Sequence, residues 1–210
     1  MPNLWTDPEH ALWYLAKADS IPHRTEGEAV LLGLLPDRCD RFLDLGCGDG
    51  RLTALVLAAK PSARGTACDF NVVMLDGARE RFEGTDVEVI EHDLDRPLGD
   101  WGQFDAVVSS FAIHHVDDDR KRSLATEVFG SLRAGGAFLN LEHVASPTTA
   151  LHEAFLVEVG VDPADDDPSN LLASVEDNLG WMRGAGFVDV DCLWRWRELA
   201  LLVGTVPEAA

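Results

Sequence analysis

The chain has 210 residues, of which 17 are basic and 37 acidic, and its formal charge at pH 7 is −20. This length suggests one domain, or one domain with a small added segment. The acidity is even, because residues 1–105 hold 10 basic and 20 acidic side chains and residues 106–210 hold 7 and 17. Such a field repels phosphate backbones and anionic lipids, so neither nucleic acid nor a membrane is expected as the main partner.

The first residues and the cysteines bear on the compartment. The sequence starts with neither the positive segment nor the apolar run of a secretory signal, and no stretch reaches the roughly 20 apolar residues of a membrane-spanning helix. No two cysteines form a Cys-x-x-Cys pair, which argues against a disulfide framework and a structural zinc site. The cysteines are Cys39, Cys47, Cys68 and Cys192. We therefore expect a cytoplasmic protein.

Apolar periodicity predicts the elements in chain order. Two helices come first, an amphipathic one over 7–20 and one over 25–35 that starts with the capping-box pattern Thr25-Glu26-Gly27-Glu28. Strands are expected at 41–46, 64–69, 86–91, 104–110 and 136–143, and helices at 50–59, 72–83 and 119–133. This alternation predicts an α/β fold with a doubly wound, parallel sheet and right-handed crossovers.

The alternation stops after His143. The elements expected beyond it are helices at 147–161 and 174–185, an acidic loop at 162–168, and strands at 187–194 and 196–203. The last two strands are close enough to pair as an antiparallel hairpin. The chain thus divides into an N-terminal helical arm over 1–36 and a main domain over 37–210, with an inserted cap at about 145–172.

The most informative stretch is residues 42–52, an apolar strand followed by a glycine-rich turn and the start of a helix. Glycines let the backbone turn sharply and approach a ligand closely, and the helix N-terminus presents free N–H groups. Gly46, Gly48 and Gly50 form Gly-x-Gly-x-Gly, and Arg51 follows. This spacing fits neither the Gly-x-Gly-x-x-Gly of dinucleotide sites nor a Walker loop. A tight structural connection is the alternative.

The segment Leu43-Asp44-Leu45-Gly46-Cys47-Gly48-Asp49-Gly50 resembles the first motif of the class I S-adenosylmethionine-dependent methyltransferases, and the likeness extends over essentially all of 40–204. The resemblance implies a Rossmann-like, mostly parallel seven-stranded sheet with helices on both faces. It implies S-adenosyl-L-methionine as cofactor and S-adenosyl-L-homocysteine as product. It also implies that the loop carries the methionine end of the cofactor. The binding residues implied there are Asp44, Gly46, Cys47, Gly48 and Gly50.

The second strand ends in Asp69-Phe70-Asn71. An acidic residue at this place can accept hydrogen bonds from both ribose hydroxyls. The alternative is that Asp69 caps the following helix, although Asn71 suits that task. The resemblance adds Asp69, Phe70, Asn71 and Met74 to the expected cofactor site.

Two further strand ends complete the expected cofactor site. By resemblance, Asp93 would bind the adenine amino group and Leu94 would pack beside the ring, with a solvated turn as the alternative role for Asp93. The segment 104–116 looks like the family's fourth motif. It places Ser110 and Phe111 at the carboxyl end of a central strand, where open parallel sheets bind ligands.

Methyl transfer from a sulfonium is an in-line displacement that requires alignment and exclusion of water. A general base is needed only when the acceptor arrives protonated. His114, His115 and His143 lie at the expected active-site edge and are the catalytic candidates, because histidine titrates near neutral pH. Glu142 could orient the imidazole of its neighbour His143. Loop packing or substrate contact is the alternative role for each histidine.

Residues of the arm and of the C-terminal half are also expected to contribute to the site. The resemblance implies that the arm folds over the cofactor, so that Arg24 would meet the cofactor carboxylate and Trp13 or Tyr14 would close the pocket. The alternative is that the arm only packs on the core. The apolar residues expected to face the substrate are Phe155, Leu156, Trp194 and Trp196. The aspartate runs 117–119 and 165–167 are expected to form solvated loops or helix starts, with Asp118 as the N-cap of the helix over 119–133, so no metal is expected.

The sequence therefore predicts an S-adenosylmethionine-dependent methyltransferase with a small-molecule acceptor, whose accepting atom and oligomeric state are open, a dimer included. One alternative is an enzyme of the same fold that makes or uses carboxy-S-adenosylmethionine, with Arg24, Arg195 and Arg197 holding the extra carboxylate. Another is a non-catalytic regulatory protein that only binds the cofactor. A nicotinamide-dependent dehydrogenase is disfavoured by the closing hairpin.

Overall fold

The structure is a computed structural model that describes residues 5, 9, 12 and 20–209. Most of the helix expected over 7–20 lies outside the described residues, as do Trp13 and Tyr14. The second expected helix is present as α2, Arg24–Gly33.

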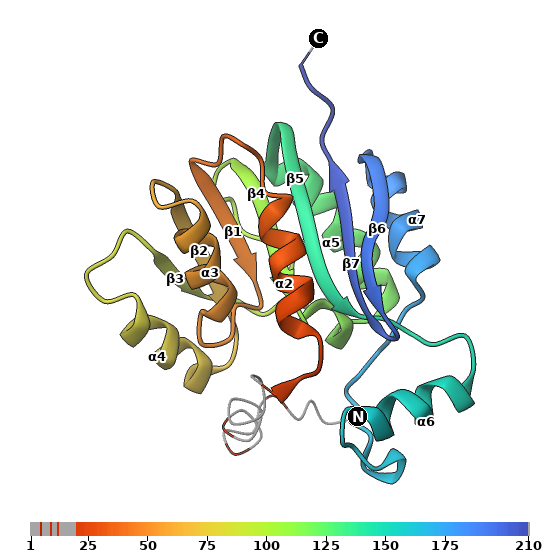
Figure 1. The fold of residues 1–210 in the computed structure, drawn as a ribbon. Helices are drawn as coiled ribbons and strands as arrows, with labels where there is room; N and C mark the ends of the chain where they lie inside the picture. Colours follow the sequence, from red (N-terminus) through yellow and green to blue (C-terminus); the bar gives the residue numbers. More distant parts are fainter. Residues whose placement is uncertain (1–4, 6–8, 10–11, 13–19, 210) are drawn as a thin grey trace.

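Within the described residues, seven strands form one sheet in the order β3-β2-β1-β4-β5-β7-β6 (Figure 1). The strands are β1 Arg41–Leu45, β2 Arg64–Asp69, β3 Glu88–Glu91, β4 Phe104–Ser110, β5 Leu132–His143, β6 Val188–Trp196 and β7 Leu199–Thr205. Strands β1 to β5 pair in parallel, whereas β7 runs antiparallel to both β5 and β6. This confirms the predicted doubly wound, mostly parallel sheet with its C-terminal antiparallel hairpin.

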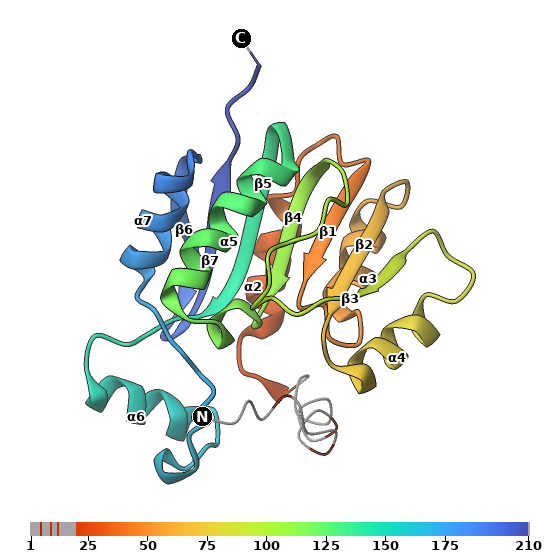
Figure 2. The ribbon, with the colours of Figure 1, turned by 180° about the vertical axis from the view of Figure 1, so that it is seen from behind.

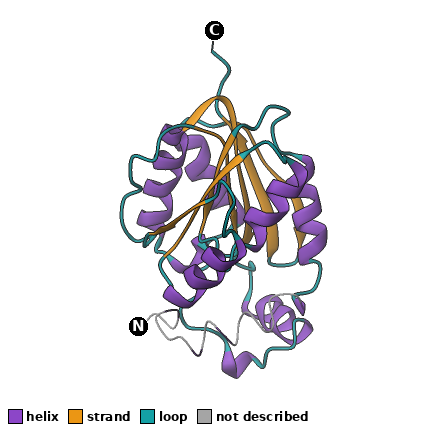
Figure 3. Ribbon diagram, turned by 90° about the vertical axis from the view of Figure 1, so that its left-hand side faces the viewer, coloured by secondary structure: helices purple, strands orange, loops and turns teal. Residues whose placement is uncertain are grey.

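Both faces of the sheet are buried under apolar clusters. Successive residues of a strand point to opposite sides, so each strand contributes side chains to both clusters. Phe42 packs in the apolar cluster of one face and Leu43 in that of the other, and Val108 and Val107 divide in the same way. All of β4 is buried, as expected for an apolar central strand. Figure 3 shows helices on both sides of the sheet.

The helices that cover the sheet are α2, α3 Arg51–Ala59, α4 Val72–Arg81, α5 Asp118–Ser131 and α7 Val175–Ala185. Helices α2 and α3 lie on the face of Phe42, and α5 and α7 lie together on the opposite face (Figure 2). Helix α5 starts one residue earlier than expected, because Asp117 rather than Asp118 caps it by accepting the Arg120 N–H at 2.8 Å. Strand β5 likewise starts at Leu132, directly after α5.

The expected insertion after β5 contains α6, Thr149–Glu158, and a short 3-10 helix η4, Pro163–Asp165. Figure 1 shows α6 beyond the carboxyl ends of the parallel strands. It packs against the start of β7 through a small apolar cluster of Phe155, Leu156 and Leu199. Among the helices described, none has both the length and the apolar character needed to cross a membrane.

Candidate active site

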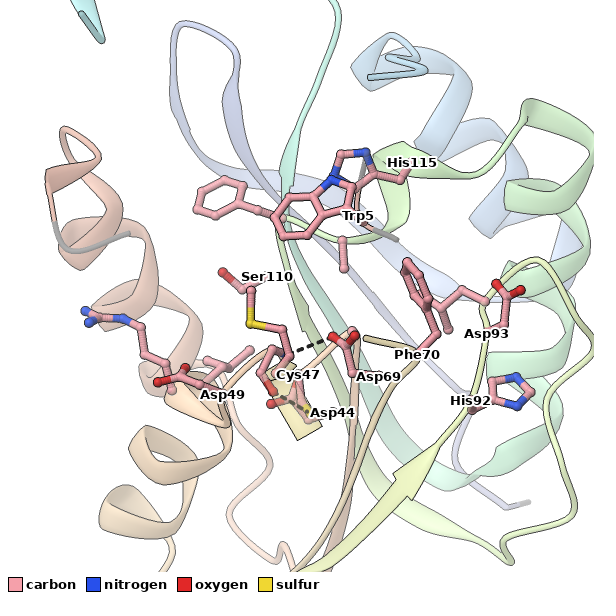
Figure 4. A pocket seen from close by; sticks show the side chains of 18 of the residues that line it. Trp5, Asp44, Cys47, Asp49, Asp69, Phe70, His92, Asp93, Ser110 and His115 are labelled. Carbon is pink, nitrogen blue, oxygen red and sulfur yellow. Dashed lines mark hydrogen bonds between the residues drawn. The ribbon is translucent and has the colours of Figure 1, made fainter. Parts of the chain in front are cut away.

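A cavity opens at the carboxyl ends of the parallel strands, lined by the segments that follow β1, β2, β3 and β4 (Figure 4). It encloses about 940 Å³ of space between atoms, including solvent at its open side. Most of the residues expected to bind the cofactor meet here. They are Arg24, Asp44, Gly46, Cys47, Gly48, Asp69, Phe70, Met74, Asp93, Leu94, Ser110 and Phe111. This is the edge at which open parallel sheets bind their ligands.

The glycine loop brings the end of β1 against the segment after β4. Gly46 has a φ of +66°, and a Cβ atom there would lie 2.2 Å from the Cβ of Ala112. Gly48 has a φ of +56°, but a Cβ on it would have no atom nearer than the Met74 Sδ at 3.8 Å. Gly46 is therefore required for close packing, whereas Gly48 leaves room beside the backbone for a ligand.

Two of the expected cofactor residues do not line the cavity. Gly50 precedes α3 with a φ of +83°, and a Cβ on it would meet the Phe82 ring at 2.3 Å. Asn71 caps α4 by accepting the Met74 N–H at 3.1 Å, and its Nδ2 donates to the Trp5 carbonyl at 2.6 Å. Both residues shape the loops behind the cavity wall.

Asp44 forms part of the cavity floor and is fully buried. Its Oδ2 accepts a hydrogen bond from the Thr53 hydroxyl at 2.6 Å, and its Oδ1 is buried with no hydrogen-bond partner in the described structure. Burial raises the pKa of this carboxyl to about 7. An unpaired buried acceptor is costly. The oxygen therefore suits a donor on a bound ligand, such as the ammonium of an amino-acid group.

Asp69 joins the end of β2 to the glycine loop. Its Oδ2 accepts the Gly48 N–H and its Oδ1 accepts the Asn71 N–H, each at 2.9 Å. Figure 4 shows this carboxylate at the centre of the cavity, between Cys47 and Phe70. A carboxylate oxygen has a second lone pair, so both oxygens can still accept a hydroxyl. The residues present therefore fit a ribose with two free hydroxyls.

Asp93 and Leu94 follow β3 on the far side of the cavity. Asp93 accepts the Asp95 N–H at 3.0 Å in a local turn, and Leu94 is buried. The Asp93 carboxylate lies beside Phe70 in Figure 4. This wall thus combines one acceptor with apolar surface, which suits a planar base.

Arg24 is buried in the wall of the cavity. Its Nε donates a hydrogen bond to Glu28 at 2.9 Å, which holds the side chain in place. Glu28 also accepts two hydrogen bonds from Arg51, one from its Nε at 2.9 Å and one from a second guanidinium nitrogen at 3.0 Å. Burial works against ionisation of Glu28, but the two guanidinium groups outweigh it and lower its pKa. The Arg24 guanidinium lies 5.4 Å from the Phe111 ring centroid. A fixed guanidinium of this kind suits a carboxylate.

Of the three histidine candidates, only His115 lines the cavity. His114 is buried, with its Nδ1 2.6 Å from Glu142 Oε1. His143 instead places its Nε2 2.9 Å from Glu198 Oε2. The expected orientation of His143 by Glu142 is therefore wrong, because neighbouring side chains on a strand point to opposite faces.

His115 lies in the 3-10 helix η3, Ile113–His115, at the rim of the cavity. Its Nδ1 lies 3.2 Å from the Ser169 carbonyl oxygen, and its ring centroid lies 5.2 Å from that of Trp5 (Figure 4). Burial and the adjacent His114 lower its pKa to about 3, so the ring is neutral at physiological pH. Its Nε2 is buried and has no hydrogen-bond partner among the described residues.

The aromatic residues expected to face the substrate lie beside the cavity rather than in its wall. Trp194 and Trp196 share a face of β6, as period-two alternation predicts, and both pack, as Phe111 does, against the cluster that contains Phe155. Phe111 is thus the link between this apolar cluster and the cavity.

The arginines of the carboxy-S-adenosylmethionine alternative divide. Arg24 lines the cavity, but Arg195 and Arg197 do not. The Arg195 Nε donates to the Arg197 carbonyl at 2.8 Å, and Arg197 pairs with Glu158. Neither is placed to hold a second carboxylate.

The cavity also contains residues to which the motifs assigned no role. They are Trp5, Asp49, Arg51, Leu52, His92, Asp95, Ala112 and Val116. Asp49, Arg51 and Leu52 belong to the glycine-loop segment, so their position alone could have pointed to them. Ala112 likewise follows Phe111 in the segment after β4, whereas Trp5 reaches the site through tertiary packing, for which no local pattern exists.

Comparison with known proteins agrees with this geometry. Residues 42–136 match a family model described as a methyltransferase domain. The chain is 31% identical over 121 residues to an uncharacterized methyltransferase of Mycobacterium tuberculosis, covering 58% of this chain and 59% of that protein. It is 30% identical over 166 residues to a ubiquinone/menaquinone biosynthesis C-methyltransferase of Desulfotalea psychrophila, covering 71% and 66%. Over 117 residues it is 31% identical to ribosomal RNA small subunit methyltransferase C of Shewanella loihica, covering 54% and 34%.

A solved structure shows the same fold over the whole chain. An O-methyltransferase family protein from Burkholderia thailandensis superposes with a TM-score of 0.75 at 22% identity, covering 100% of this chain and 65% of that one. The chain spans about three fifths of the length of the first curated relatives it matches, 59%. The matched segment contains the glycine loop, Asp69, Asp93 and the end of β4, which together line most of the cavity. The chain belongs to the class I S-adenosylmethionine-dependent methyltransferases.

Proposed function

We propose that this protein is an enzyme that transfers a methyl group from S-adenosylmethionine to a small-molecule acceptor by in-line displacement. The unpaired Oδ1 of Asp44, buried in the cavity floor beside the glycine loop, carries the proposal. A buried carboxylate oxygen without a donor is stabilised by a cationic ligand such as the ammonium of a methionine group. When bound, S-adenosylmethionine supplies a methyl group already activated by a sulfonium.

The cavity residues divide the cofactor among them. Asp44 and Arg24 would hold the ammonium and carboxylate of its amino-acid end. Asp69 would accept the ribose hydroxyls, and Asp93 the adenine amino group, with Leu94 beside the ring. Each of these groups already faces the cavity and is held by backbone or side-chain hydrogen bonds. Such preorganisation lowers the entropy lost on binding.

The acceptor side of the cavity favours a small molecule. Its walls there are the Phe111 and Trp5 rings and the neutral His115. The arm over 1–36 and the cap over 145–172 would close this side and exclude water. One relative is a ribosomal RNA methyltransferase, but the formal charge of −20 on this chain opposes the approach of a nucleic acid. The charge therefore favours a small molecule over RNA as the acceptor.

His115 is the residue of the three candidates that we place against the acceptor. His114 and His143 hold Glu142 and Glu198 and lie outside the cavity wall, so they stabilise the fold rather than contact the substrate.

Isothermal titration of the whole protein with S-adenosylhomocysteine tests the cofactor part of the proposal. We expect saturable one-to-one binding, and no binding of NAD. Incubation with methyl-labelled S-adenosylmethionine, with either a small-molecule extract or ribosomal RNA, tests the acceptor. Label in the small-molecule fraction supports the proposal, whereas label in RNA alone contradicts it. Failure to bind S-adenosylhomocysteine would overturn it entirely.

A further inference from the structure

The loop over 167–171 is joined by two hydrogen bonds to the two-histidine segment after β4, and by a third to helix α5. The Leu171 N–H donates to the His114 carbonyl at 2.9 Å. The His115 Nδ1 lies 3.2 Å from the Ser169 carbonyl oxygen. The buried Lys121 completes the junction by donating its Nζ to the Leu171 carbonyl. The cap therefore touches the cavity rim at one defined place.

The Ser169 contact determines where the His115 proton lies. A carbonyl oxygen only accepts hydrogen bonds, so the nitrogen that faces it must carry the hydrogen. A neutral imidazole has one N–H, and the other ring nitrogen is then an unprotonated acceptor. In His115 this other nitrogen is Nε2, which is buried in a cavity-lining residue and lacks a partner in the described structure.

Asp167 in turn fixes the peptide of Ser169. Its Oδ1 accepts both the Ser169 N–H at 2.8 Å and the Ser169 hydroxyl at 2.7 Å. The Ser169 Oγ also lies 3.4 Å from His115 Nδ1. A loop carbonyl without such support would be free to rotate away, and the imidazole would exchange between its two tautomers.

We propose that Asp167 and Ser169 are positioning residues that hold His115 in its Nδ1–H form, so that Nε2 accepts a hydrogen bond from a hydroxyl or N–H group of the methyl acceptor. This rests on the proposed function, because it assumes that the acceptor enters the same cavity. The class of acceptor follows from the chemistry. A site that offers a lone acceptor discriminates strongly against an analogue whose hydroxyl or N–H is missing.

Nitrogen-15 NMR of the histidine rings tests the positioning directly and needs no known acceptor. We expect one protonated Nδ1 and one unprotonated Nε2 for His115, assigned by its loss in His115→Asn. Asp167→Ala should average the two nitrogen signals. Asp167→Asn keeps an oxygen acceptor for the Ser169 N–H and should restore the separate signals. Asp165→Ala, an exposed acid in the same loop, is the matched control.

The affinity for S-adenosylhomocysteine separates this inference from the function on which it rests. All of the Asp167 and Asp165 variants should bind it like the unchanged protein. If the unchanged protein does not bind S-adenosylhomocysteine, the proposed function is wrong. If His115 Nε2 is protonated, or if the Asp167→Ala spectrum is identical to that of the parent, only the positioning role is overturned.

Phenol and anisole test the acceptor class in the presence of S-adenosylhomocysteine. The two have similar shape, but only phenol has a hydroxyl to donate. Phenol should shift the His115 Nε2 signal and anisole should leave it unchanged. Equal shifts with both, or no shift with phenol up to its solubility limit, would overturn the assignment. Trp5→Phe keeps an aromatic ring beside His115 but removes the indole N–H. A change in the Nε2 signal of the free protein in this variant would show that the arm, rather than an acceptor, uses this nitrogen.

Discussion

The Thr53 hydroxyl donates to Asp44 Oδ2 at 2.6 Å, and Thr53 thereby holds a buried carboxylate whose second oxygen has no donor among the described residues. Helix α3 supplies Thr53 and strand β1 supplies Asp44, so the turn between them sets the position of the charge. The pKa of about 7 follows from burial of this group away from water. The protein thus keeps a carboxyl that is ready to ionise once a cation lies beside it.

The affinity for S-adenosylhomocysteine should therefore depend on pH. A cationic ammonium favours the ionised carboxylate, so binding lowers the Asp44 pKa, and the affinity rises as pH increases towards and through about 7 before levelling off. Titration calorimetry between pH 5.5 and 8.0 measures this dependence. Asp44→Asn should bind more weakly at pH 8.0 and show no rise. Identical slopes for the parent and Asp44→Asn would remove Asp44 from the ammonium site.

Alanine at the loop glycines should separate packing from backbone strain. Gly48→Ala forces a non-glycine residue to positive φ and should cost about 1–2 kcal/mol of unfolding free energy. Gly46→Ala adds a collision with Ala112, and overpacking contributes about 1–3 kcal/mol more. Urea unfolding gives both values. Gly84→Ala is the control for φ alone, because its φ is +76° and no atom lies within 4 Å of the added carbon. Equal losses for Gly46→Ala and Gly84→Ala would contradict the close contact.

The glycine loop and the strand ends could be predicted because their signals are local. A strand, three glycines and a helix lie within eleven residues, and the carboxyl ends of parallel strands always meet at one edge of the sheet. The role of Gly50 could not be read in this way. Its neighbour Phe82 is far along the chain, and the spacing of the glycines is the same whether each one faces a ligand or a packed ring.

The histidines show a second limit. Glu142 and His143 are adjacent in sequence, but strand alternation separates their side chains, and each finds a partner from another segment. The partner of His143 is Glu198, in the turn between β6 and β7. The contact of Ser169 with His115 likewise depends on the path of the cap, which has no periodic pattern. Pairs of polar side chains that are far apart along the chain could therefore not be predicted from the sequence.

Ligands that share adenosine but differ at the amino-acid end should identify the role of Arg24. Arg24→Ala removes one charge-assisted interaction and should weaken S-adenosylhomocysteine binding by about 1.5–3 kcal/mol. Methylthioadenosine has no carboxylate, so its affinity should not change. Asp69→Ala is the matched variant, because loss of the ribose contact should weaken both ligands. Titration calorimetry with both ligands measures the difference. If Arg24→Ala weakens the two ligands equally, the guanidinium does not hold the carboxylate.

The attachment of α6 should weaken as pH rises. His152 in this helix places its Nδ1 3.1 Å from both oxygens of Glu198 and its Nε2 3.1 Å from Asp166. Burial opposes a charge on His152, but the hydrogen bonds to the two carboxylates outweigh it and raise its pKa. Burial also opposes ionisation of Glu198, and the bonds from His143, Ser146 and His152 outweigh it and lower its pKa.

The directions of these two pKa shifts define the pH range in which the contacts between His152 and Glu198 stabilise the attachment of α6. The contribution of His152 is fully present below the ordinary histidine pKa of 6.5 and is lost as pH rises through its higher folded value. The contribution of Glu198 is present above 4.5 and is lost as pH falls through its lower folded value. Hydrogen exchange of the α6 amides, corrected for intrinsic rates, should therefore show more protection at pH 5.5 than at pH 8.5. His152→Gln should abolish the difference, and α7 should show none in either protein. Equal protection of α6 at both pH values in the unchanged protein would mean that packing of Phe155 and Leu156, rather than the charged histidine, holds the cap.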